Sequence, residues 1–510
     1  MNPPAGGLVL RPSSFVLPQK LNVSISETSP KEPTTVLRTS LRKVTIAWLF
    51  GASWVNLTTG AVLTQYAKRL DLSPFGFGLM AAVPWLGALV QFPASYVVEK
   101  YGHRRAAFLW TGFPHRAMWL VIAAIPWVLP RAWWWPSLLI LMTMSAVTAN
   151  CGTPAAMSWM ADLVPPRIRG RYLSRRSQAA QLAPVVAVIA SGYAMDRAAV
   201  MGANAMLATI SIVLALAALF GMLDFSIIST VRGPKDSPPD ASLSFRQLVR
   251  HPLSDRSFRR FLAFNFTLTL ATAATGQFIW LYMFNEAHMS NVRANILFVI
   301  VPLLVSFLSY PIWGRLVDRL GRKPVLFISC ALIVHGAIPW AFITPERWLL
   351  PYLAVLVTSA SWPGVDIASF NLLLGATQTR GGRRWGSAYI ALNSFIVAIA
   401  GTLAGVMLGA LAEALKEWRG TLFGYPLTYH FILFVFSALL RLAALGWLLG
   451  IEEPRAYSLR AAVSYITADL YSGAQQIVFL PVRLVGRVGQ WTYKLFPDGR
   501  AAKRDDRRPK

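Results

Sequence analysis

Long apolar runs dominate the pattern of hydrophobic and polar positions along this chain. Each run holds about 20 or more residues with few charges, the length an α-helix needs to cross the hydrocarbon of a membrane. Because backbone amides in lipid find no water, each run is expected to form its own hydrogen bonds as a helix. Twelve such runs are predicted, at residues 44–66, 75–98, 106–129, 135–159, 178–200, 204–228, 260–284, 293–316, 325–344, 348–374, 387–412 and 427–450.

The composition supports a membrane protein over a soluble one. Of the 510 residues, 55% are hydrophobic and only 14% are charged, whereas soluble domains carry about 25% charged residues. So little charge leaves too little polar surface to cover a soluble globule of this size. The fold class predicted from these observations is an all-α polytopic membrane protein.

Basic residues set the expected orientation. The formal net charge is +27, which alone would also suit a nucleic-acid partner. The Lys and Arg residues gather in short clusters between apolar runs, however, and they favour one side of the predicted membrane. These clusters lie at residues 100–105, 167–176, 229–260, 315–323 and 380–384. By the positive-inside rule, both termini are predicted to be cytoplasmic in a multi-pass protein of the cell (inner or plasma) membrane, with no nucleic acid bound.

The two halves of the chain repeat each other at an offset of 213 to 219 residues. Thr59-Gly60 and Tyr66 match Thr275-Gly276 and Tyr282, Val83-Pro84 matches Val301-Pro302, and Ala124–Trp127 recurs as Ala337–Trp340. The expected organisation is a flexible cytoplasmic tail (1–43), a six-helix bundle (44–228), a cytoplasmic linker (229–258), a second six-helix bundle (259–451) and a basic tail (452–510). The last of these is either amphipathic on the membrane surface or solvated. Duplicated bundles place a binding site at their interface, where the halves can rock, so transport is the expected mechanism.

Two loops carry a motif that identifies a family. Residues 314–323 read Gly-Arg-Leu-Val-Asp-Arg-Leu-Gly-Arg-Lys, and residues 95–105 hold a degenerate copy with Ser and Glu at the Gly and Asp positions. The first segment resembles the signature loop of the major facilitator superfamily, and the segment at 162–172 also resembles bacterial members. The likeness covers residues 44–450 and leaves both tails unexplained. It implies twelve transmembrane helices in two pseudo-symmetric six-helix bundles.

The resemblance also implies a role for these loops as conformational latches. Asp318 is expected to meet the start of the helix near Ser177, and Glu99 the start of the helix near Ser387. A carboxylate at a helix N-terminus gains about 0.3–2 kcal/mol. The loop residues involved are Glu99, Gly102, Arg104, Arg105, Gly314, Asp318, Arg319, Gly321, Arg322 and Lys323. The alternative is that their charges only set the topology.

The first, fourth, seventh and tenth runs line a central cavity in the family that the chain resembles. Polar side chains within those runs are costly in lipid, and several fall on single helical faces. The candidate cavity residues are Asn56, Thr59, Thr148, Asn150, Asn265, Thr269, Thr272, Gln277, Trp280 and Trp362. Any one of them can instead serve to hydrogen-bond a neighbouring helix.

Asp366 is the candidate for coupling transport to an ion. It is the only carboxylate well inside its run, on one face with Thr358, Trp362 and Ser369. An unpaired carboxylate in low dielectric tends to its neutral form, which suits a proton-coupled carrier. A salt bridge with a helix-borne Arg is the alternative. Four further polar residues, His115, Arg116, His335 and Arg441, fall on runs that the resemblance makes peripheral, where packing, snorkelling or lipid contact is expected.

The function predicted from these patterns is secondary active transport of a small solute by alternating access, coupled to protons. An uncoupled facilitator, or a sensor or scaffold that kept the fold, are the alternatives. Motifs for enzymes are absent from the sequence, and the two cysteines, Cys151 and Cys330, lie in apolar runs. We therefore expect a monomer with a small-molecule substrate, membrane lipid and protons as partners, and neither a cofactor nor a bound metal.

Overall fold

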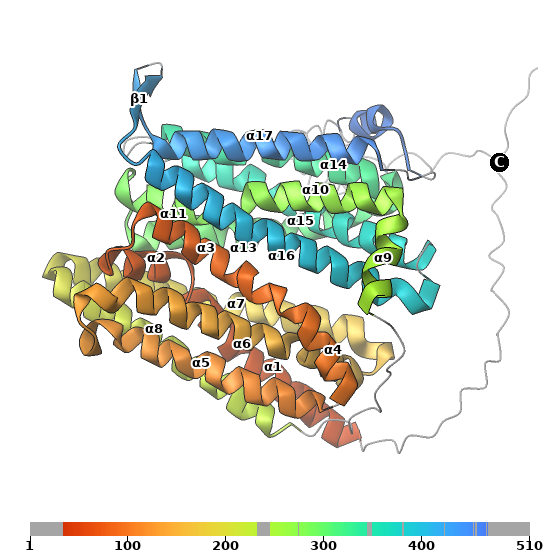
Figure 1. Ribbon diagram of the computed structural model, residues 1–510, viewed down its shortest axis with the longest axis horizontal. Coiled ribbons are helices and arrows are strands. Elements are labelled where there is room, and N and C mark those ends of the chain that lie inside the picture. The colour runs from red at the N-terminus through yellow and green to blue at the C-terminus, as the bar shows by residue number, and fades with distance from the viewer. Residues whose placement is uncertain are drawn as a thin grey trace, which may run out of the picture.

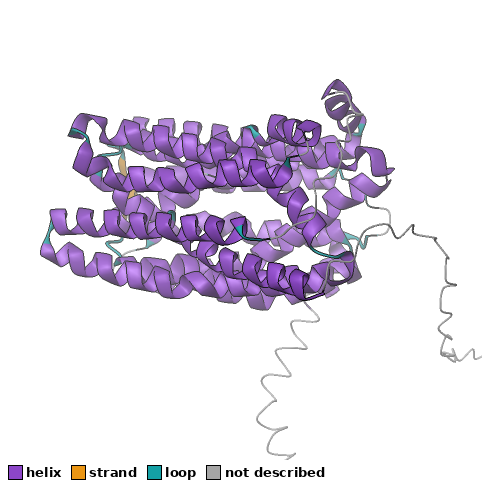
Figure 2. Cartoon of the chain, turned by 90° about the horizontal axis from the view of Figure 1, so that it is seen from below, coloured by secondary structure: helices purple, strands orange, loops and turns teal. Residues whose placement is uncertain are grey.

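The computed structural model describes residues 34–101, 103–231, 245–273, 275–343, 349–379, 382–422, 424–451, 453, 456–465 and 467. Within these ranges the chain is almost entirely helical, and its strands form a single antiparallel hairpin with Arg419 opposite Thr428. The helices run roughly parallel in two layers, one from each half of the sequence (Figures 1 and 2). The all-helical prediction is confirmed.

The N-half comprises α1 (Thr34–Leu57), α2 (Gly60–Arg69), α3 (Pro74–Leu89), α4 (Gln91–Tyr101), α5 (Arg104–Val128), η1 (Arg131–Trp133), α6 (Trp134–Leu163), α7 (Pro166–Met201) and α8 (Ala203–Ser229). A short helix, α9 (Phe245–Ser254), leads into the C-half. The C-half comprises α10 (Arg256–Thr272), α11 (Thr275–Asn285), α12 (Asn291–Asn295), η2 (Ile296–Ile300), α13 (Val301–Leu320), α14 (Arg322–Ile333), η3 (Val334–Phe342), α15 (Leu349–Thr379), α16 (Gly382–Ala414), β1 (Arg419–Leu422), β2 (Tyr425–Thr428) and α17 (Tyr429–Leu449).

Each of the twelve predicted runs coincides with one helix or with two or three consecutive ones. Nine helical segments of the described chain are long and apolar enough to span a membrane, and the bent pair α1 and α2 makes a tenth. The other two runs, α5 and the pair α10 and α11, lie alongside the spans in the same layers (Figure 1). Both carry charged residues within or at the start of the helix, such as Arg116 and Arg260, which lower their mean hydropathy.

The first and seventh runs are each broken at the Thr-Gly pair that the sequence repeats. The chain bends by 41° between α1 and α2, and Gly60 has φ of +60°, a conformation that costs glycine least. The break between α10 and α11 precedes Thr275. Beyond the breaks, Tyr66 donates a hydrogen bond to the Ile122 carbonyl and Tyr282 donates one to the Ile343 carbonyl. The internal repeat is therefore a repeat of structure.

The boundaries depart from the predicted ones in three places. Helix α1 begins at Thr34, before the predicted start at residue 44, and α9 forms within the predicted linker. The ninth run changes from α-helix to 3-10 helix after Ile333, where the repeated Pro339 follows. Residues 1–33 of the predicted tail 1–43, residues 468–510 of the predicted tail 452–510, and residues 232–244 of the predicted linker lie outside the described residues.

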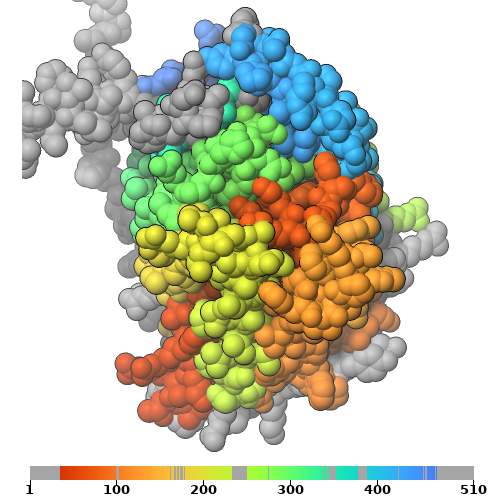
Figure 3. Space-filling view, turned by 90° about the vertical axis from the view of Figure 1, so that its left-hand side faces the viewer, coloured from red at the N-terminus to blue at the C-terminus, as the bar shows by residue number. Residues whose placement is uncertain are grey.

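Among the described residues, the two halves bury their largest shared apolar cluster toward one end of the bundle, which we call the hairpin end because it carries β1 and β2. The opposite end, which holds Thr34, α9 and Ile451, is called the linker end. The largest buried apolar cluster joins Trp54, Tyr66 and Ile122 of the N-half to Trp280 and Phe434 of the C-half. Seen from the hairpin end, side chains of both halves fill the face (Figure 3). The other two buried clusters each belong to one half.

Glycines allow the closest approach between the halves, where α3 crosses α16. A Cβ on Gly78 would collide with the backbone of Gly405 and Gly409, and a Cβ on Gly409 would lie 2.9 Å from the Gly78 Cα. Backbones touch directly at such small-residue crossings, as membrane helix pairs commonly do. This contact anchors the closed hairpin end.

Candidate functional site

Three neighbouring cavities lie on or near the boundary between the two halves. The first, of about 730 Å³, lies among α1, α7, α11 and α13 and is called the α1–α13 cavity. The second, of about 590 Å³, lies among α10, α15 and α16 and is called the α10–α16 cavity. The third, of about 260 Å³, lies within the C-half and is called the side pocket. The side pocket shares Phe298 and Pro302 with the first cavity and Trp362 with the second.

The α1–α13 cavity contains three of the predicted residues, Asn56, Thr59 and Trp280. They come together because the break after Thr58 turns the polar end of α1 toward α11, so that Gly60 packs against the Trp280 ring. The sequence analysis did not identify Gln181 of α7 or Tyr310 of α13, which line the same cavity. Each of these two residues is an isolated polar position on an apolar helix, so no helical periodicity of polar residues marks it in the sequence.

The α10–α16 cavity contains four predicted residues: Asn265, Thr269, Trp362 and Asp366. Asn265 and Thr269 lie one turn apart on α10, so they present a common face. Asn265 donates a 2.7 Å hydrogen bond to Asn393 of α16, which the sequence analysis missed. Most of the predicted polar stripes of the seventh and tenth runs therefore face this cavity, and their remaining members, Thr272 and Thr358, line the side pocket.

Asp366 sits between the first two cavities. Its carboxylate lines the α10–α16 cavity and accepts a 3.1 Å hydrogen bond from the hydroxyl of Tyr310, which lines the α1–α13 cavity. Within the described residues, Asp366 makes no ion pair with a basic side chain. A helix-borne Arg partner, one of the two predicted environments, is therefore not found in the described chain.

Three predicted cavity residues lie elsewhere. Thr148 donates back to the Met144 carbonyl of its own helix. Asn150 accepts a 2.6 Å hydrogen bond from Gln91 of α4. Gln277 donates a 2.9 Å bond to Thr64, which joins α11 to α2 across the halves. Asn150 and Gln277 therefore bond neighbouring helices, as the alternative for these residues predicts, whereas Thr148 bonds only its own helix and Thr272 lines the side pocket.

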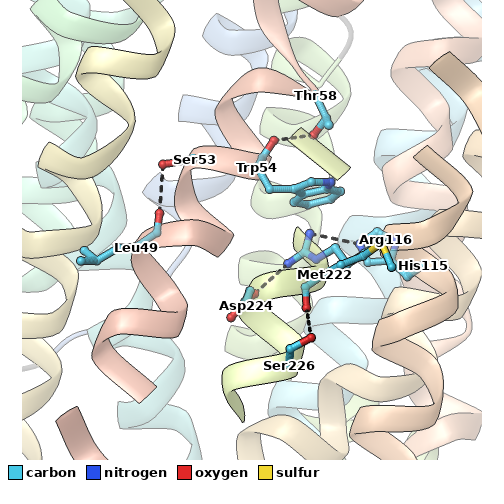
Figure 4. Close-up of polar contacts among 9 residues, drawn as sticks. All are labelled: Leu49, Ser53, Trp54, Thr58, His115, Arg116, Met222, Asp224 and Ser226. Atoms are coloured by element: carbon cyan, nitrogen blue, oxygen red, sulfur yellow. Dashed lines mark hydrogen bonds and ion pairs between the residues drawn. The ribbon is translucent and has the colours of Figure 1, made fainter. Parts of the chain in front are cut away.

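A buried ion pair holds the interior of the N-half. Arg116 of α5 lies 3.4 Å from the Asp224 carboxylate of α8, and the two side chains are 7% and 3% exposed. The guanidinium also stacks on Trp54, 3.5 Å from the ring centroid, with His115 beside it (Figure 4). Arg116 was expected to pack, snorkel or touch lipid; it packs, and neither snorkels nor faces lipid. The pair is structural in character because none of the three cavities reaches it.

Arg441 of α17, in contrast, borders the side pocket and is 6% exposed. It donates a 2.7 Å hydrogen bond to the Ile333 carbonyl, at the point where α14 gives way to 3-10 helix. No carboxylate in the described chain pairs with it. Of the expected roles of packing, snorkelling or lipid contact, the structure shows packing, and the packed guanidinium also borders a pocket, which the family resemblance did not indicate.

The predicted latch loops at the linker end contact their own halves. Arg104 forms a 2.7 Å ion pair with Asp162, and Arg319 donates to the Tyr465 hydroxyl. The backbone amides of Arg322 and Lys323, at the start of α14, donate to the Glu453 carboxylate. Such a cap satisfies amides left open by the helix and is favoured by the helix dipole.

Of the predicted cross-half latch, the described residues include the Asp318 side chain but not its expected partner. Asp318 is exposed and bonds no described residue. Gly321 has φ of +96° and so makes the turn that the motif predicts, and nothing lies within 4 Å of a Cβ built on Gly314. Gly102 and the side chains of Glu99, Ser177 and Ser387 lie outside the described residues, so the latch remains a prediction.

Two carboxylates cap helices across the halves at the hairpin end. Asp196 of α7 accepts hydrogen bonds from the backbone amides of Asn291 and Val292, at 2.7 and 3.1 Å, where α12 begins. Glu413 of α16 accepts a 3.2 Å bond from the amide of Phe75, where α3 begins. The two caps lie at matching places in the repeat. Together with the glycine crossing, they hold the hairpin end shut.

The geometry is that of two open cavities beside a smaller side pocket, in a two-layer bundle whose halves pack closely at the hairpin end. Polar side chains and indoles from both halves face them, which suits a small polar or amphipathic solute. Within the described ranges, no group of three His, Cys, Asp or Glu side chains is placed to hold a metal ion.

Comparison with known proteins gives a consistent picture. Residues 44–405 match the family model described as Major Facilitator Superfamily. No curated protein matches the sequence of the chain. Solved structures match in fold: a variant of the nucleoside transporter NupG (TM-score 0.62, 13% identity, covering 82% of this chain and 100% of that one), a D-xylose–proton symporter (0.60, 15%, 84% and 99%), and a variant of the E. coli fucose:proton symporter FucP (0.51, 15%, 82% and 99%). At these identities the likeness is one of fold alone.

Proposed function

Because this chain belongs to the major facilitator superfamily, and so is a multi-pass membrane transporter of a small solute and not an enzyme, we propose that it carries its solute by alternating access coupled to protons. The observation that carries the proposal is Asp366, a carboxylate without a counter-ion in the described chain, placed between the α10–α16 cavity and the α1–α13 cavity, which residues of both halves line.

The linker end is the cytoplasmic end in this proposal. Four basic clusters of the sequence lie in or beside the connections α4–α5, α6–α7, α13–α14 and α15–α16, with residues 167–176 in the first turns of α7, and these connections all lie at that end. Loops rich in Lys and Arg stay in the cytoplasm during insertion. The arrangement described above then corresponds to an inward-facing state, with the hairpin end closed on the outside.

Asp366 is proposed to be the proton carrier. Proton uptake would neutralise the carboxylate and loosen its bond with Tyr310, which joins α13 to α15. Intramembrane carboxylates commonly act in this way in pumps and transporters. Two structural neighbours are proton symporters by name, which supports the coupling.

Cysteine accessibility tests alternating access without knowledge of the substrate. In a C151A/C330A background, a cysteine at Asn56 is placed in the α1–α13 cavity. A membrane-impermeant maleimide should label it rapidly from the linker end in inside-out vesicles, and slowly from the hairpin end in right-side-out vesicles. Labelling from one end only, at every pH, would favour the sensor or scaffold over a carrier.

Asp366→Asn tests the coupling. In the wild type, the ratio of the two labelling rates should change with pH, because the protonation state of Asp366 biases the two states. The Asn variant should insert normally and lose that pH dependence. Asp71→Asn is the matched control, since Asp71 is exposed at the hairpin end and pairs with Arg131. A pH dependence that persists in Asp366→Asn would exclude this carboxylate and favour the uncoupled facilitator.

A further inference from the structure

The side pocket carries a positive charge that the protein itself does not neutralise. Arg441 is 6% exposed, yet its only hydrogen bond in the described chain is the one to the Ile333 carbonyl. Its Nε–H has no partner among the described residues. Burying an unpaired charge is costly, and ionisable groups at membrane depth are retained chiefly for function.

The internal repeat shows that the missing partner is specific to this half. Arg441 lies 217 residues after Asp224 and so takes its place in the second copy, while the offset of 213 between Ala124–Trp127 and Ala337–Trp340 pairs Arg116 with Ser329. In the N-half these positions form an ion pair of zero net charge. In the C-half the two corresponding positions hold a guanidinium and a serine hydroxyl that donates to the Val325 carbonyl of its own helix, so one positive charge remains.

The space beside Arg441 is kept open. A Cβ at Gly336 would lie 2.9 Å from the Arg441 Nη1 and 2.9 Å from the Thr358 Oγ1. Glycine at this position therefore lets the guanidinium and the hydroxyl border one pocket. The hydroxyl of Ser359 and the indole N–H groups of Trp340 and Trp362, on the same walls, have no hydrogen-bond partner in the described chain.

We infer that the side pocket binds the carboxylate of a small amphipathic monoanion, with Arg441 as its counter-ion. A guanidinium matches a carboxylate with two parallel hydrogen bonds. One arginine without a second cation balances a single charge, which favours a carboxylate over a phosphate dianion. The remaining walls are largely aromatic and aliphatic, so the rest of the ligand is an aromatic or aliphatic group.

The size and position of the pocket fit a ligand that enters from the central cavities. Its volume of about 260 Å³ is just below the range of about 300–1,000 Å³ typical of drug-sized ligands. Through Phe298, Pro302 and Trp362 it borders both larger cavities. This inference deepens the proposed transport function and rests on it, because it names the class of the solute.

Binding of benzoate and phenylacetate to the purified full-length protein tests the inference. Each acid is compared with its neutral amide, benzamide or phenylacetamide, which has nearly the same shape. At least one acid should raise the midpoint of thermal unfolding in a saturable manner at constant ionic strength, and its amide should not. Equal shifts for acid and amide, or no shift with either acid, would overturn the inference.

Variants assign the binding to Arg441. Arg441→Gln should weaken binding of the acid by about tenfold or more, and Arg441→Lys should weaken it less. Ser437→Ala is the control, since Ser437 lies one turn away on α17 and donates to the Ala271 carbonyl outside the pocket. Should Arg441→Gln fail to fold, Gly336→Ala provides a second test, because its methyl group displaces the guanidinium or Thr358. Unchanged affinity for the acid in the folded variants would show that Arg441 serves only to donate its hydrogen bond to the Ile333 carbonyl.

The outcomes separate this inference from the proposed function. If Asn56→Cys is labelled from both ends but neither acid binds, the chain is a carrier of another solute class. If an acid binds through Arg441 but labelling occurs from one end only, the anion site stands and the carrier mechanism fails.

Discussion

The two halves of this transporter each bury an arginine, but only the N-half balances its charge with a carboxylate. In the N-half, Arg116 is stacked under Trp54 and paired with Asp224, away from the cavities. In the C-half, Arg441 occupies the position that matches Asp224 and has a carbonyl for its only described partner, beside a pocket. A duplicated fold can therefore keep one copy of a buried polar site for stability and leave the other copy for a ligand.

The largest effect is expected from breaking the N-half pair. Arg116→Gln leaves the Asp224 carboxylate buried without its partner, and removing one member of a buried ion pair costs about 3–5 kcal/mol. Arg441→Gln removes a charge that has no ionic partner, so it should change the stability by no more than about 1–2 kcal/mol. Thermal or denaturant unfolding of the purified variants in one detergent measures both.

The double variant Arg116→Gln/Asp224→Asn sharpens this comparison. Removing both charges should restore most of the stability lost in Arg116→Gln, because no unpaired charge remains buried. If Arg441→Gln destabilised the ligand-free protein as much as Arg116→Gln, the distinction between a structural and a ligand-facing arginine would not hold.

A smaller effect is expected at the two carboxylate caps of the hairpin end. Asp196→Ala removes an acceptor of two backbone amides, whereas Glu413→Ala removes an acceptor of one. Loss of a helix cap costs about 0.5–2 kcal/mol. Because these caps join the two halves, the loss destabilises the conformer in which the hairpin end is closed. Labelling of a cysteine at Asn56 from that end should therefore accelerate, by about 5–30-fold for Asp196→Ala and by less for Glu413→Ala.

The mutant of an exposed hairpin-end residue, Glu417→Ala, serves as the control for both caps. Equal acceleration by all three variants would indicate a general loosening of the hairpin end.

The smallest effect is expected at the tyrosines that the repeat places alike. Tyr66→Phe and Tyr282→Phe each remove one hydrogen bond to a carbonyl of a neighbouring helix. A bond of this kind contributes about 1 kcal/mol, and the two losses should agree with each other. The same unfolding measurement checks them, and a difference of several kcal/mol would mean that the halves are not equivalent outside the arginine sites.

The fold was largely predictable from the sequence because its signals are local. Twelve apolar runs fixed the helices, and the repeated Thr-Gly, Val-Pro and Ala-Ile-Pro-Trp segments indicated the duplication. The breaks at Thr59 and before Thr275 were not predicted, although the repeated pairs mark them. A Gly in an apolar run is compatible with a straight helix, so only packing against Trp280 and its surroundings reveals the bend.

The site was predictable only where polar residues repeat along one helix. Asn265, Thr269, Trp362 and Asp366 share helical faces, and they share a cavity. Thr148 and Asn150 met the same criterion of residue type, but their hydrogen bonds lie within α6 and to α4. Arg441 was assigned to the periphery, since a lone arginine carries no periodic signal and its face depends on tertiary packing.

The glycine crossing of α3 and α16 has a mechanical consequence. With two backbones in contact at Gly78, nothing softer than a peptide group separates the halves there, so the crossing acts as a stiff fulcrum near the hairpin end. A methyl group added at Gly78 would hold the two backbones apart. It would raise the free energy of the conformer in which they touch and leave unchanged that of the conformer in which they are separated. The equilibrium between the two conformers of the carrier therefore depends partly on the absence of side chains at this crossing.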